Sequence, residues 1–140
     1  MIIPRKQFIR TLLAAATLAA GSAAWAGGNG ETRLKARLAG PAIGTLRPSG
    51  AADFRSASGR SRLNVEVEDV NLAAGTQLSV WSQRGANAPS MIGVITLGPP
   101  PLRTGELELN TQDGQSVPAI QAGDVITVRN GDQAILSGTM

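Results

Sequence analysis

Apolar and polar residues alternate along several segments of the chain, and this pattern constrains the fold more than any other feature of the sequence. The clearest examples are residues 33–38, 63–68, 77–80 and 106–109. A period of two places successive side chains on opposite faces of a β-strand, one toward a core and one toward water. No window after residue 26 shows the period of an amphipathic helix. The sequence therefore predicts an all-β protein.

Turn-forming residues separate the alternating segments. They are RPSG at 47–50, SASG at 56–59, QDG at 112–114 and NGD at 130–132. Asn130-Gly131 between two apolar runs is typical of a two-residue hairpin turn in which both central residues have positive φ. Eight or nine short antiparallel strands fit between the turns of this chain. Their spacing of about 8–12 residues predicts a Greek-key sandwich or a partly open barrel.

The first 26 residues have the three parts of a secretory signal peptide. These parts are the positive charges of Arg5, Lys6 and Arg10, the apolar run 12–20, and the small residues Ala24 and Ala26 at the cleavage site. The apolar run is too short to span a bilayer of roughly 30 Å. We expect a periplasmic or extracellular protein with no transmembrane anchor in its mature form. Lys6 stands where twin-arginine export needs a second arginine, so general secretion is favoured.

After the signal peptide we expect a flexible lead-in, residues 27–32, and a single domain, residues 33–140. Within this domain LAAGTQLSV at 72–80 is similar to IQAGDVITV at 120–128. Gly75 and Gly123 in these stretches are expected to supply backbone freedom at turns that enter strands. Together with the preceding segments, the similarity predicts an imperfect internal duplication of residues 43–80 in residues 92–128. The alternative is that one kind of turn evolved twice.

The charges of the mature chain are balanced in number but unevenly distributed. Ten basic and ten acidic residues remain after residue 26, whereas a nucleic-acid binder needs a basic excess. Residues 27–62 carry a net charge of +5 and residues 63–140 carry −5. Facing opposite charges on paired strands contribute about 0.2–1 kcal/mol each. We therefore expect cross-strand pairing between a basic strand and acidic strands, with an exposed interaction face as the alternative. The residues concerned are Arg33, Lys35, Arg37, Glu66, Glu68, Glu106 and Glu108.

The side-chain inventory excludes several kinds of catalysis. Histidine, cysteine and tyrosine are absent, which excludes Ser-His-Asp and Cys-His nucleophilic systems and the usual zinc sites. We expect no cofactor, no metal and no enzymatic activity. The alternative is a small hydrolase that uses the pair Glu66/Glu68 or the pair Glu106/Glu108. Side chains two residues apart on a strand lie about 7 Å from each other, within the range of glycosidase carboxyl pairs.

Trp81 is the candidate partner contact. Leu78 and Val80 have the inward parity of their strand, so Trp81 has the outward parity, beside the polar loop 83–90. Tryptophans often anchor interfaces, and the alternative is that Trp81 covers an open end of the sandwich. We expect an exported, non-catalytic module with a binding or structural role. Its partner would be a protein or a surface polymer, and self-association is possible.

The stretch at 50–81, GAADFRSASGRSRLNVEVEDVNLAAGTQLSVW, resembles the CHRD module, a secreted Greek-key β-domain. The matching positions are Gly50, Ala52, Phe54, Leu63, Val65, Val67 and Leu72. CHRD modules usually carry histidines just after this stretch, and this chain has none. The resemblance therefore implies a secreted β-domain but no metal or enzyme-like role. The stretch at 105–128 is similar to bacterial exported proteins, which implies export without an activity.

Overall fold

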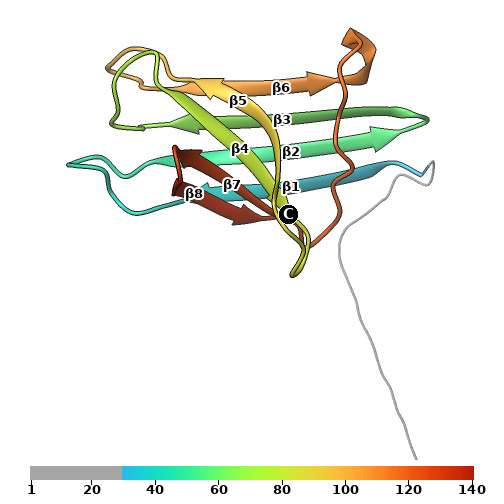
Figure 1. The fold of residues 1–140 in the computed structure, drawn as a ribbon. Helices are drawn as coiled ribbons and strands as arrows, with labels where there is room; N and C mark the ends of the chain where they lie inside the picture. Colours follow the sequence, from blue (N-terminus) through green and yellow to red (C-terminus); the bar gives the residue numbers. More distant parts are fainter. Residues whose placement is uncertain (1–29) are drawn as a thin grey trace, which may run out of the picture.

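The computed structural model describes residues 30–140, which form eight β-strands and one short 3-10 helix (Figure 1). The strands are β1 (Thr32–Ala39), β2 (Ser49–Ala57), β3 (Arg60–Glu68), β4 (Gln77–Gln83), β5 (Ser90–Thr96), β6 (Gly105–Asn110), β7 (Val125–Asn130) and β8 (Gln133–Thr139), and the helix is η2 (Thr111–Asp113). The predicted signal peptide, with Ala24 and Ala26, and most of the predicted lead-in lie outside the described residues. The domain begins with β1 at Thr32, one residue earlier than predicted.

All eight strands are antiparallel and form one sheet that nearly closes into a barrel. The order is β5-β4-β7-β8-β1-β2-β3-β6, so β5 and β6 are the two free edges. These edges lie side by side, and the loop between them is closed by a hydrogen bond from Gly98 N to Thr104 O of 2.8 Å. If β5 and β6 are treated as neighbours across this gap, the four strands β4, β5, β6 and β7 lie in the Greek-key order β7-β4-β5-β6. The predicted all-β, partly open barrel is confirmed.

The sheet folds into two layers that cross at a steep angle (Figure 1). One layer contains β6, β3, β2 and β1, and the other contains β5, β4, β7 and β8. The layers are joined at β1 and β8, where Ala39 faces Ser137 as the only registered pair. The alternating apolar residues of both layers meet between them. Most are buried, among them Leu38, Leu63 and Ile126, whereas Leu34, Leu107 and Leu109 are partly buried at the border of the core. Phe54 on β2 is also part of this core, 3% exposed.

Short connections determine which strands become neighbours. Ser58 and Gly59 both have positive φ, 52° and 78°, and form a two-residue turn that pairs β2 with β3. Pairing of consecutive strands through short turns is the most frequent arrangement in β-proteins. The segment 115–124 contains no strand and packs Ile120, 4% exposed, against the core.

The two similar stretches of the sequence form equivalent turns. Gly75 and Gly123 have φ values of 85° and 93° and stand just before β4 and β7. Gly75 N donates to Leu97 O at 2.7 Å, and Gly123 N donates to Met140 O at 2.8 Å. Each glycine thus ties the start of one hairpin to its end. The duplication itself stays a prediction. At the start of the two ranges the structures differ, because residues 43–46 form a tight turn whereas the residues that begin the second range, 92–128, lie in β5.

The hairpin at Asn130-Gly131 is present, but its turn is shifted by one residue. Asn130 is the last residue of β7 and pairs with Gln133, so the two central residues are Gly131 and Asp132. Only Gly131 has a positive φ, 60°. The shift accompanies a β-bulge between Val128 and Arg129, which changes the register of the two strands just before the turn.

Within residues 30–140, no helix has the length and apolar character needed to cross a membrane.

Candidate functional site

The outer face of the β5-β4-β7-β8 layer carries Trp81. Its neighbours in the register are Met91 on β5 and Thr127 on β7, and Ser79, Val94 and Arg129 form the next row. We name these six residues, Ser79, Trp81, Met91, Val94, Thr127 and Arg129, the tryptophan face. They point outward because the intervening residues Leu78, Val80 and Val128 are fully buried.

Two contacts fix the indole of Trp81 on this face. Its Nε1 donates a hydrogen bond to Ser79 Oγ at 2.8 Å. The guanidinium carbon of Arg129 lies 4.3 Å from the ring centroid, a cation–π distance. The two hairpins of this layer are matched, because each has a β-bulge just before the contact residue, at Val80/Trp81 and at Val128/Arg129. Trp81 and Arg129 therefore hold equivalent positions in β4 and β7.

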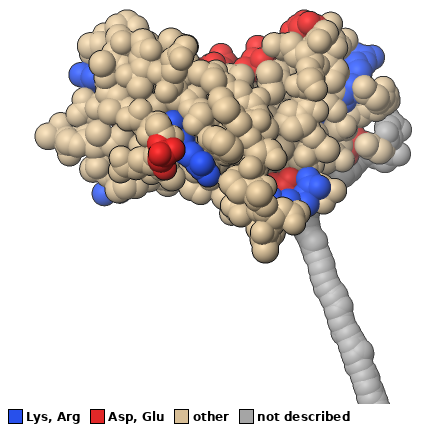
Figure 2. Space-filling model, in the orientation of Figure 1, with Lys and Arg blue, Asp and Glu red and all other residues tan. Residues whose placement is uncertain are grey.

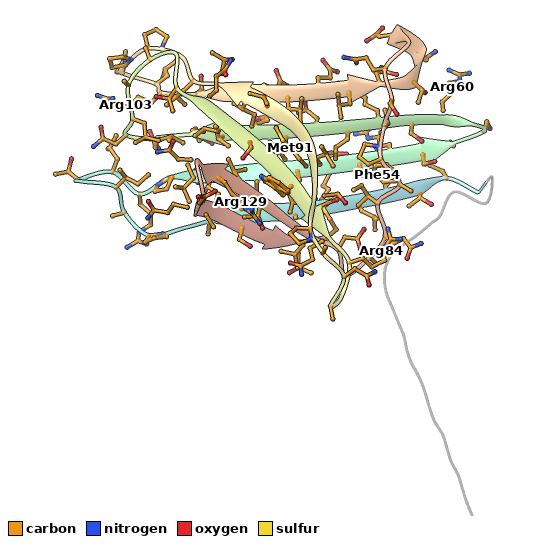
Figure 3. All side chains as sticks on the ribbon, in the orientation of Figure 1. Phe54, Arg60, Arg84, Met91, Arg103 and Arg129 are labelled. Atoms are coloured by element: carbon orange, nitrogen blue, oxygen red, sulfur yellow. The ribbon has the colours of Figure 1, made fainter. Side chains whose placement is uncertain are left out.

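The tryptophan face is nearly free of charge. Arg129 is the only charged residue in β4, β5, β7 and β8. Figure 2 shows few acidic or basic side chains over this face, and Figure 3 shows Met91 and Arg129 on its β5 and β7 strands. Met91 and Val94 are 51% and 40% exposed. The face therefore combines a fixed aromatic ring, one cation and exposed apolar side chains.

The outer face of the other layer is highly charged. In its register Lys35 lies beside Asp53, which lies beside Asn64 and then Glu108. The next row runs from Arg37 through Ala51 and Glu66 to Glu106. We name the outward residues of β1, β2, β3 and β6 the charged face. Its cations lie mainly toward β1 and the β2–β3 turn, and its anions gather toward β3 and β6.

The charged face differs from the expected pairing of a basic strand with acidic strands. Because β2 lies between β1 and β3, Arg33, Lys35 and Arg37 are not direct neighbours of the glutamates. The ion pairs are Arg33–Glu31 at 3.8 Å, Lys35–Asp53 at 3.5 Å, Arg55–Asp53 at 3.5 Å and Arg62–Glu108 at 2.7 Å. Within residues 30–140 no ion pair joins two of the seven residues chosen from the sequence.

An open groove of about 720 Å³ runs over β1, β2 and β3 on the charged face. Its floor includes Ser49 and Ala51, whose side chains are small. The basic residues on its β1 side are Lys35, Arg37 and Arg47, and the acidic residues on its β3 side are Glu66 and Glu68. Glu66 accepts a hydrogen bond from Asn64 Nδ2 at 3.2 Å. Opposite charges therefore line the two sides of the groove, and Asp53 between them is paired with Lys35 and Arg55.

An ion pair between a half-exposed arginine and a buried aspartate, which sequence reasoning missed, joins the loop after β4 to the segment before β7. Arg84 Nε and Nη2 donate to the two carboxylate oxygens of Asp124 at 3.0 and 2.9 Å. The backbone N–H of Gln121 donates to the same carboxylate at 2.8 Å. These hydrogen bonds, chiefly those from Arg84, hold the pKa of Asp124 below its ordinary value although burial acts in the opposite direction. Asp124 is 3% exposed, so its carboxylate stabilises the barrel and is not accessible from solvent.

In the part of the chain that the structure describes, no group of three or more acidic side chains is arranged to hold a metal ion. Phe54 and Trp81 are the only aromatic residues of this part, and Phe54 is buried. No cleft therefore brings an aromatic platform next to the glutamates of the charged face.

The chain was compared with protein-family models, with curated proteins and with solved structures, and none of them matches it. The resemblance of residues 50–81 to the CHRD module accordingly stays a prediction. The function is therefore inferred from the two outer faces alone.

Proposed function

We propose that the protein is an exported, non-catalytic binding module that holds a protein partner on its tryptophan face. The observation that carries this proposal is the Trp81–Arg129 stack beside exposed Met91 and Val94, on strands with no other charge. Tryptophan, arginine and methionine are enriched at protein interfaces, and charged residues are depleted in interface cores. The composition of the tryptophan face follows this pattern.

Preorganisation of Trp81 supports a recognition role. Its indole is already held by Ser79 Oγ at 2.8 Å and by Arg129 at 4.3 Å. A side chain that is fixed before binding loses less conformational entropy when a partner docks. Because Arg129 covers one face of the ring, a sugar would have to displace the guanidinium before it could stack there. A protein partner is therefore favoured over a surface polymer.

The alternative, a small carboxylate-pair hydrolase, has less support. Glu66 and Glu68 line an open groove together with Lys35 and Arg37. Glu66 directly faces Glu106 in the register of β3 and β6, and both side chains are exposed. A glycosidase needs two carboxyl groups and a cleft that encloses a sugar. This surface supplies the carboxyl groups but not the enclosing cleft.

Replacement of Trp81 by alanine is expected to abolish capture of the partner. The chain from residue 27 onward would be immobilised and exposed to the exported proteins of the bacterium that produces it. We expect Trp81→Ala and Arg129→Ala to weaken binding by about tenfold or more, as loss of a central interface anchor does. The measurement is the amount of captured protein and its dissociation constant.

Arg60→Ala is the matched control, because Arg60 is an exposed arginine at the β2–β3 turn, away from the tryptophan face (Figure 3). It should capture the same protein with unchanged affinity. Capture that is equally strong with Trp81→Ala, or capture of a glycan alone, would contradict the proposal. Circular dichroism of each variant verifies that the barrel is intact.

A further inference from the structure

We infer that two copies of this chain associate through their charged faces, with a two-fold axis that runs along β2. The first observation is that charges near the groove are not neutralised within one copy. Arg37 and Arg47 have no carboxylate within 4.0 Å among the described residues, and neither Glu66 nor Glu68 has a basic partner there. Each copy thus presents unpaired cations and unpaired anions on one open surface.

The second observation is the placement of these charges on either side of β2. Arg37 on β1 and Glu66 on β3 both lie in the row of Ala51. Two strand spacings separate them, about 10 Å. Between them the floor is formed by Ala51 and Ser49, which keep the middle of the surface low. Over the groove the β1 side is therefore basic and the β3 side is acidic. Asp53 on β2, between the two sides, is paired with Arg55, and Arg62, farther along β3, is paired with Glu108.

A surface of this kind is complementary to itself. A two-fold axis in the plane of contact and parallel to β2 exchanges the two sides, so the basic side of one copy faces the acidic side of the other. The contact is isologous and closes at two subunits. Arg37 and Arg47 of one copy then oppose Glu66 and Glu68 of the second copy.

The charges on the axis are paired within each copy. Arg55 and Asp53 lie two residues apart on the same face of β2 and form an ion pair of 3.5 Å. A two-fold axis along β2 places Arg55 opposite Arg55 and Asp53 opposite Asp53 of the second copy. Because each pair is neutral, the four charges sum to zero, and this part of the contact adds no attraction. The small side chains of Ser49 and Ala51 allow the two β2 strands to come close.

The size of the surface sets the strength of the association. Four strands of about seven residues cover roughly 500 Å² per copy, so a dimer would bury about 1,000 Å² in total, the lower end for specific interfaces. The contacts are mainly between exposed charges, which salt screens. We therefore expect a weak dimer that dissociates as the ionic strength rises. In this dimer the two tryptophan faces point away from each other and remain free, so the inference is independent of the proposed function.

Sedimentation velocity of the chain from residue 27, which contains every strand, tests the inference. The wild type should be largely dimeric in 50 mM NaCl and largely monomeric in 500 mM NaCl, with at least about a tenfold rise in the dissociation constant. Glu66→Lys with Glu68→Lys makes both sides basic and should be monomeric in either buffer. Arg37→Glu with Arg47→Glu makes both sides acidic and should also be monomeric.

The decisive sample is an equimolar mixture of these two double variants. All-basic and all-acidic faces complement each other, so the mixture should associate in 50 mM NaCl although each variant alone does not. Asp113→Lys with Asp132→Lys, which changes charges outside the groove, is the matched control and should dimerise like the wild type. A wild type that stays monomeric at low salt, or a mixture that does not associate, would overturn the inference. Binding of an added acidic or basic peptide by a monomeric wild type would point instead to a peptide site.

Discussion

Replacement of Gly138 by alanine is expected to lower the free energy of unfolding by about 3 kcal/mol, which corresponds to a fall in Tm of roughly 10–20 °C. Gly138 lies on β8, where an added Cβ would overlap the carbonyl oxygen of Arg37 on β1 and press against Leu38 Cδ2 at 2.9 Å. Arg37 O belongs to the backbone and cannot rotate away. The added methyl group must therefore push β8 from β1, the strand pair that joins the two layers.

Gly40 offers a second variant at the same junction, because its Cβ would overlap the carbonyl oxygen of Ile135. Thr139→Ala is the matched control, since Thr139 is exposed and follows Gly138 on β8. Thermal unfolding measured by circular dichroism should show a large loss for both glycine variants and little change for the control. A Gly138→Ala variant as stable as the wild type would show that β1 and β8 are not packed as closely as the structure has them.

Removal of the Asp124 carboxylate is expected to cost about 2–4 kcal/mol of unfolding free energy, because three hydrogen bonds to a buried charged group are lost together. Asp124→Ala leaves Arg84 Nε and the backbone N–H of Gln121 without an acceptor, and Arg84 Nη2 keeps only Ala119 O. The segment before β7 would be held less firmly to the loop after β4. Urea unfolding measures the loss, and Asp132→Ala on the exposed β7–β8 turn is the control.

The same pair predicts how stability depends on pH. The pKa of Asp124 is lower in the folded protein than in the unfolded chain, chiefly because Arg84 donates hydrogen bonds to the carboxylate. Its contribution to stability is therefore complete above the ordinary aspartate pKa of about 3.9 and is lost as the pH falls through the folded-state pKa. Below about pH 4 the wild type should lose stability more steeply than Asp124→Asn. Equal slopes for the two proteins would contradict this role of the ion pair.

Much of the fold follows from the alternation of side chains. Leu63, Val65 and Val67 are predicted to face a core, and all three are buried. Phe54 is buried as well, in agreement with its parity. Strand parity is a local property, so a single segment is enough to reveal it. The class of fold and the outward direction of Trp81 can therefore be read without knowledge of neighbouring strands.

Register and partners across the sheet need information that one segment does not carry. Charge alone favoured β1 beside the acidic strands, whereas the Ser58-Gly59 turn places β2 next to β3 and a β-bulge moves the last turn to Gly131-Asp132. The Arg84–Asp124 pair spans 40 positions and lies in irregular segments, where no periodic pattern predicts contact. The stack of Arg129 on Trp81 likewise depends on the pairing of β4 with β7. The two similar stretches, 72–80 and 120–128, end just before Trp81 and Arg129, and this is the one sequence signal that relates these two residues.

Binding of the partner on the outer surface around Trp81 is tested most directly by the indole N–H signal of this residue. Trp81 is the only tryptophan after residue 26, so an ¹⁵N-labelled chain from residue 27 gives one indole signal. On addition of the protein captured by the immobilised chain, this signal should shift or broaden, and the hydrogen bond to Ser79 makes its starting position well defined. A partner that binds while the indole signal keeps its position and width would contradict the account.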